Sequence, residues 1–116
     1  MIRVEPAQNI EDGIWNMISA CNEDYASNTD NVEMIDEFEN SWKILPGKKF
    51  VKVVAKHSVH SFIVKEDMFT PGGQLRFRKG DVLKAASWKA PAMNCARGNV
   101  LEGNYPIEWT GPLYLR

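Results

Sequence analysis

The chain has 116 residues, 44% of them apolar and 25% charged, which is the composition of one ordinary globular domain. No apolar run approaches the roughly 20 residues that span a bilayer, and the start lacks the basic and apolar segments of a signal peptide, so we expect neither membrane insertion nor secretion. The two cysteines, Cys21 and Cys95, lie in opposite halves and form no C-x-x-C pair, so neither a disulfide framework nor a zinc site is supported, and a single Cys21–Cys95 bridge is the open alternative. We expect two reduced core thiols and no cofactor.

The near-neutral net charge of −1 conceals an asymmetry along the chain. Residues 1–47 carry ten acidic and two basic side chains, a net charge of −8, whereas residues 48–116 carry five acidic and twelve basic side chains, a net charge of +7. Such asymmetry indicates either a charged partner or two halves that face each other or a neighbouring subunit. We expect a single domain over 1–116, with an acidic helical layer at 1–47, a basic β-rich layer at 48–116, and a homo-oligomer as an open alternative.

The first half has the 3.6-residue period of helices. Residues 2–4 are a candidate edge strand, and Asn9 is placed to cap a first helix of about four turns. The apolar positions of this helix are Ile10, Ile14, Trp15, Ile18, Cys21 and Tyr25. After the polar residues 27–31, a second apolar stripe predicts another helix, and the two form a helical hairpin that ends at Pro46-Gly47. That stripe consists of Val32, Ile35, Phe38 and Trp42.

From Lys48 onward the apolar residues have the period of strands. Runs at 50–55 and 59–64 predict an antiparallel hairpin around Lys56-His57-Ser58. Residues 66–74 are expected to form a loop. A strand at 75–78 should then turn through Lys79-Gly80-Asp81 into a strand at 82–86.

The tail from 103 to 111 is rich in turn formers. We expect the apolar residues near the end of the sequence to return to the core as a final edge element, namely Trp109, Leu113, Tyr114 and Leu115. The predicted fold class is α+β, with the helical hairpin packed on a small antiparallel sheet that is strongly bent or forms a partly open barrel.

Residues 85–100 have the composition of a binding loop, with small residues, one large aromatic ring, amides and cations. Trp88 can stack on a planar ligand while nearby cations meet phosphate or carboxylate. The candidate ligand- or partner-binding residues are Ser87, Trp88, Lys89, Asn94, Arg97 and Asn99. The structural alternative is that Pro91 starts a short helix whose apolar residues face the core, with Arg97-Gly98-Asn99 as its cap and turn.

Basic side chains alternate with apolar ones along the predicted strands, which puts many of them on one solvated face. With Phe50, Phe77 and Trp88 interleaved, that face can bind single-stranded nucleic acid. The candidate contacts are Lys52, Arg76, Arg78 and Lys84. The acidic helices oppose this hypothesis unless they lie on the far side of the molecule.

His57 and His60 flank the first predicted β-turn, with Ser58 and Ser61 beside them. They support a third hypothesis, a small enzyme that uses one of these histidines as a base. This hypothesis requires a concave pocket that holds a histidine and a polar group within hydrogen-bond reach. No third metal ligand is near in sequence, so we expect no metal site.

The segment from Phe77 reads Phe-Arg-Lys-Gly-Asp-Val-Leu-Lys-Ala-Ala-Ser-Trp-Lys-Ala-Pro-Ala and is followed by Asn94 and Ala96-Arg97-Gly98-Asn99, and a later segment reads Trp109-Thr110-Gly111-Pro112. These segments resemble small uncharacterised proteins encoded by tailed bacteriophages. The resemblance implies action in the cytoplasm of an infected bacterium, but it carries over no activity, catalytic residue or cofactor to this chain. It favours a small non-enzymatic protein that binds a host protein or a small-molecule ligand.

Overall fold

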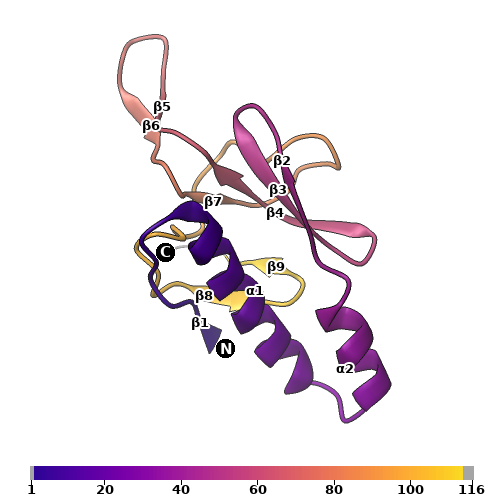
Figure 1. Cartoon of the computed structure of the whole chain (residues 1–116). Helices are drawn as coiled ribbons and strands as arrows, with labels where there is room; N and C mark the ends of the chain where they lie inside the picture. Colours follow the sequence, from indigo (N-terminus) through magenta and orange to yellow (C-terminus); the bar gives the residue numbers. More distant parts are fainter. Residues whose placement is uncertain (1, 114–116) are drawn as a thin grey trace.

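The computed structural model describes residues 2–113, and it shows an α+β fold (Figure 1). Within that range there are two helices, α1 (Ile10–Ala26) and α2 (Val32–Glu39), and nine short strands in three antiparallel sheets. The strands are β1 (Ile2–Arg3), β2 (Lys43–Pro46), β3 (Phe50–Ala55), β4 (Ser58–Val64), β5 (Met68–Phe69), β6 (Leu75–Phe77), β7 (Val82–Leu83), β8 (Pro106–Glu108) and β9 (Gly111–Pro112). The predicted fold class is confirmed, and none of these three sheets closes into a barrel.

Helix α1 begins where its cap was predicted. The Asn9 side-chain oxygen accepts a hydrogen bond from the backbone N–H of Asp12 at 2.8 Å. The two acidic residues of the first turn are attracted to the positive end of the helix dipole, which also stabilises the start of the helix. The helix buries Ile14, Met17, Ile18, Cys21 and Tyr25. Trp15, predicted on the same apolar side, is 51% exposed instead, because it follows Ile14 by one residue and therefore points about 100° away around the helix.

Helix α2 is shorter than predicted. It ends at Glu39, so Trp42 lies beyond it, and Val32 at its start is exposed. Phe38 is its buried residue and stacks nearly parallel on Tyr25 of α1, with ring centroids 4.2 Å apart. This pair joins the two helices of the predicted hairpin.

The change from helix to strand comes earlier than predicted. β2 already pairs with β3, with Pro46 as its last residue opposite Val51. Gly47 begins the turn between the two strands, where its backbone N–H donates to the carbonyl of Phe50 at 2.8 Å. β3 and β4 form the predicted antiparallel hairpin around Lys56, whose φ of 55° completes the tight turn. The central sheet has the strand order β2-β3-β4-β7.

The central sheet is covered on both faces. On one face, Val51, Val53, Ile63 and Val82 form a core with Ile14, Met17 and Ile18 of α1. On the other face, Phe62, Val64 and Leu83 form a second core with Phe77, Met93 and Ala96. Because successive residues of a strand alternate between faces, Lys52 belongs to the second face, directly opposite Phe62 in the register. The segment that follows β7 covers this second face.

Two smaller sheets complete the structure. The segment predicted as a loop at 66–74 contains β5, which pairs with β6 in a projecting hairpin. β1 is the predicted edge strand of the sheet β1-β8-β9, and Trp109 at its β8–β9 turn packs on Tyr25 and Phe38. The predicted contributions of Tyr114 and Leu115 lie outside the described residues. Neither helix in the described range is long and apolar enough to cross a membrane.

Candidate functional site

Trp88 projects from a tight turn in the segment after β7. The backbone N–H groups of Ala86 and Ser87 both donate to the carbonyl of Ala90, and the Ser87 hydroxyl accepts from the N–H groups of Lys89 and Ala90 at 3.3 and 3.2 Å. An isolated bridge between Ala85 and Pro91 closes the base of the turn. The short helix of the structural alternative does not form here, and the turn leaves Trp88 51% exposed.

The ammonium group of Lys52, on β3, lies over one face of the Trp88 ring. Its Nζ lies 4.5 Å from the centroid of the Trp88 ring and 5.9 Å from that of Phe62. A cation over an aromatic face is attracted by the electron-rich ring, which restrains both side chains. The candidate binding loop and the basic β face predicted from the sequence therefore meet at one place.

A hollow of about 320 Å³ lies beside this contact. Its lining includes four lysines, Lys48, Lys49, Lys52 and Lys89. The aromatic rings of Phe50 and Phe62 also line it. Within residues 2–113, the two ion pairs both belong to Arg78, so none of these four lysines has a carboxylate partner there. We call the hollow together with Trp88 the Trp88 surface.

Arg97 and Asn99 do not reach the Trp88 surface. Asn99 is buried, and its side-chain amide donates to the carbonyl of Lys79 and the carboxylate of Asp81, both at 2.9 Å, while its oxygen accepts from the backbone N–H groups of Leu101 and Glu102. Its bonding capacity is thus used to fix two turns. Arg97 is only 1% exposed and donates from Nε to the carbonyl of Cys95. Both residues have interior positions that hold the segment in place.

The remaining predicted contacts are dispersed. Asn94 is exposed, and its oxygen accepts from the backbone N–H of Cys95. Arg76 donates to the carbonyl of Met93 at 2.6 Å, and Arg78 pairs with Glu102 and Asp81. Lys84 is exposed on the segment after β7. Of the four predicted nucleic-acid contacts, Lys52 alone lines the hollow.

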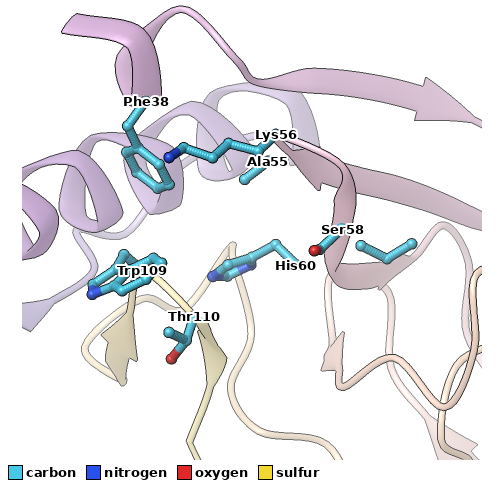
Figure 2. A pocket seen from close by; sticks show the side chains of 8 residues that line it. Phe38, Ala55, Lys56, Ser58, His60, Trp109 and Thr110 are labelled. Atoms are coloured by element: carbon cyan, nitrogen blue, oxygen red, sulfur yellow. The ribbon is translucent and has the colours of Figure 1, made fainter. Parts of the chain in front are cut away.

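His60 lines a separate pocket of about 180 Å³ (Figure 2). Its walls come from three parts of the chain: Phe38 of α2, the β3–β4 hairpin, and the β8–β9 turn with Trp109 and Thr110. In Figure 2, the Lys56 side chain extends toward the ring of Phe38. His57, on the same hairpin turn, is exposed.

The His60 ring has a partner at each nitrogen. Nε2 lies 3.0 Å from the carbonyl oxygen of Glu108, which can only accept, so Nε2 carries the proton and Nδ1 accepts from the Ser61 hydroxyl at 3.0 Å. Burial lowers the pKa of His60 to about 4, although the hydrogen bond to Glu108 opposes this shift. The imidazole is therefore neutral at pH 7.

Cys21 lies 3.4 Å from Nε2 of His60, a separation at which a nucleophile and its base can exchange a proton. The protonated Nε2 has no lone pair to take the thiol proton, and the Cys21 thiol itself donates to the carbonyl of Glu108 at 3.6 Å. Burial, with the nearby charge of Asp24, raises the pKa of the Cys21 thiol well above its usual range. This pair stabilises the interior in its neutral form, and its electrostatics are opposite to those of an activated thiolate.

The sequence interpretation included Phe50 in the basic β face, but it did not name Lys48, Lys49 or Phe62 among the candidate contacts. The Lys-Lys pair after Pro46-Gly47 could have indicated exposed cations at this site, because residues of a turn are usually exposed to solvent. Residues 2–113 contain no group of three or more His, Cys, Asp or Glu side chains able to hold a metal ion.

These features define a small α+β protein in which one face of the central sheet carries a lysine-lined hollow beside an exposed tryptophan. The chain belongs to a family of unknown function, DUF7717, whose model matches residues 2–115. No curated protein and no solved structure matches the chain.

Proposed function

We propose that this protein is a small non-enzymatic binding protein that engages a negatively charged partner through the Trp88 surface. The observation that carries the proposal is the contact between Lys52 and Trp88 at the rim of the hollow. It combines an exposed, restrained aromatic ring with cations that lack carboxylate partners within the described residues. Rigid aromatic rings beside charged groups are the side chains that dominate binding energies at protein surfaces.

The resemblance to bacteriophage proteins supports a role in the cytoplasm of an infected bacterium. There the partner would be a host protein or a small ligand, and the cationic lining restricts it to one that carries negative charge. The interior, neutral state of the Cys21–His60 pair favours binding over nucleophilic catalysis.

Affinity purification with paired tryptophan variants tests this function. The tagged protein, its Trp88→Ala variant and its Trp15→Ala variant are each used on a bacterial lysate, and retained proteins, nucleic acids and small molecules are identified. Trp15 is a matched control, because it is also 51% exposed but lies on α1. We expect the Trp88→Ala variant to lose a component that the other two proteins retain, with a decrease of about tenfold, since one stacked ring contributes about 1–3 kcal/mol.

Circular dichroism of the Trp88→Ala variant is the control that tests whether the fold is kept. A component retained equally by the unsubstituted protein and the Trp88→Ala variant would exclude the Trp88 surface as its binding site.

A further inference from the structure

A second hollow adjoins the first. It also measures about 320 Å³, and its lining is Lys48, Lys49, Lys65, Glu66, Asp67, Met68 and Phe69. Lys48 and Lys49 line both hollows, so the two lie next to each other at the turn between β2 and β3. We call the two hollows together the lysine trough.

Exposed aromatic rings stand at the two ends of the lysine trough. Trp88 is 51% exposed at the first hollow, and Phe69, on β5, is 61% exposed at the second. Between them lie Lys48 and Lys49, both exposed, with Lys52 and Lys89 next to Trp88. The trough thus alternates ring, cations and ring.

The negative charges near the trough are few and partly engaged. The Asp67 carboxylate accepts from the backbone N–H of Lys79 at 2.8 Å, and Glu66 is exposed beside it. Lys65 donates to the carbonyl of Gly47, which adds positive charge to the wall of the trough. Helices α1 and α2 each carry four acidic residues and no basic one. Helix α2 lies at the opposite end of the molecule from the β5–β6 hairpin, so a polyanion in the trough avoids it (Figure 1). The first turn of α1 is nearer to the trough, since Glu11 lines a separate hollow with Pro46.

Resting on the proposed function, we propose that the partner is single-stranded nucleic acid that lies along the lysine trough, with bases stacked on Trp88 and Phe69 and phosphates near Lys48 and Lys49. Cations that follow a backbone, with aromatic rings for successive bases, are the elements of sequence-independent single-strand binding. A duplex offers its phosphates but keeps its bases stacked on each other, so it leaves both rings without a partner. An acidic protein segment likewise uses the lysines and gains little from two separated rings.

Fluorescence anisotropy with a labelled oligothymidylate of about 12 nucleotides tests the inference at about 50 and 200 mM salt. We expect binding that weakens with salt, and a loss of about fivefold or more in affinity for Trp88→Ala and for Phe69→Ala separately. The double variant Lys48→Gln, Lys49→Gln should reduce the slope of log K against log salt by about 0.7 for each lysine removed.

The matched controls change the same residue types outside the trough. Trp15→Ala and the double variant Lys43→Gln, Lys56→Gln should keep the affinity and the salt slope of the unsubstituted protein. A labelled duplex of the same length should bind more weakly than the single strand.

Two outcomes would overturn the inference. If an oligoglutamate peptide binds in a Trp88-dependent manner and the oligonucleotide does not, the partner is an acidic protein segment and the proposed function stands. If the oligonucleotide binds equally to all variants, the lysine trough is not its site. Binding of the oligonucleotide that requires Trp88, Phe69 and both trough lysines supports the inference.

Discussion

His60 is the polar residue on which three parts of the fold converge. It comes from β4, contacts Cys21 of α1, and donates to the carbonyl of Glu108 on β8. A buried imidazole is tolerated there because both nitrogens are paired and the ring stays neutral. The histidine spacing alone did not reveal this role, since it gave no indication which of the two histidines faces inward.

The lowered pKa of His60 predicts a loss of stability at acidic pH. Below pH 6.5 the unfolded chain takes up a proton on this histidine, and the folded protein does not until about pH 4. The unfolded state therefore binds more protons in this window, and His60 alone should lower the free energy of unfolding by about 3 kcal/mol as the pH falls through it. Urea unfolding between pH 7.5 and 4.5 measures the effect.

A His60→Gln variant should be less stable at pH 7.5 but approach the unsubstituted protein as the pH falls, because glutamine does not titrate. The exposed His57 provides the control, and His57→Gln should retain the original pH dependence. Parallel curves for His60→Gln and the unsubstituted protein would contradict the buried, neutral state.

The two cysteines differ in a way that the sequence did not indicate. Both are free thiols, as expected, but Cys95 is exposed and only Cys21 lies in the core. A chromogenic disulfide reagent should therefore modify one thiol in the folded protein and the second only in denaturant, because the Cys21 thiol is buried and its pKa is raised. Cys95→Ser should abolish the fast reaction. Fast modification of two thiols in the folded protein would contradict the burial of Cys21.

At the scale of elements, the contact between α1 and the chain after β7 depends on a glycine. A Cβ added at Gly13 would lie 2.6 Å from the carbonyl oxygen of Val100 and 2.7 Å from its Cβ. Glycine in a helix ordinarily costs about 1 kcal/mol relative to alanine, but here it permits the close approach of two backbones. Gly13 therefore lowers the helix propensity of α1 but allows the helix to pack closely against Val100.

Gly13→Ala should decrease the free energy of unfolding by about 1–3 kcal/mol, because the overlap with Val100 outweighs the gain in helix propensity. Denaturant titration monitored by circular dichroism measures this. Ser19→Ala, at an exposed position of the same helix, should be neutral or slightly stabilising. A Gly13→Ala variant more stable than the original protein would show that the helix can shift without loss.

The elements that could be predicted from sequence are those specified by local chemistry. The Asn9 cap predicted the start of α1, the strand period predicted β3 and β4, and Gly80, with φ of 91°, forms the predicted turn. β2 and β5 are too short to show a period, and they form because β3 and β6 pair with them.

The candidate site could be predicted only in part, for the same reason. Trp88 and Lys52 were both identified from residue type, but their contact depends on how the segment after β7 folds back over the sheet. Arg97 looked like a surface cation, and its burial likewise follows from long-range packing. Composition thus indicated candidate residues without indicating which of them share one surface.

At the scale of the molecule, charge is separated along an elongated shape of 51 × 26 × 25 Å. The two ion pairs within residues 2–113 both join residues of the basic half, so no ion pair in that range connects the acidic half to the basic half. The predicted asymmetry is therefore not neutralised by such pairs, and the α2 end and the lysine trough present opposite potentials to the solvent.

The turn that carries Lys48 and Lys49 has a consequence for how this family can diverge. Both lysines are exposed outside β2 and β3, whereas the residues that hold the sheet together, such as Phe62 and Leu83, are buried beneath. Substitutions at exposed turn positions usually change stability by less than about 0.5 kcal/mol. Mutation can therefore alter the charge of the trough, and under the proposed function the choice of partner, while the folding of the chain is left undisturbed.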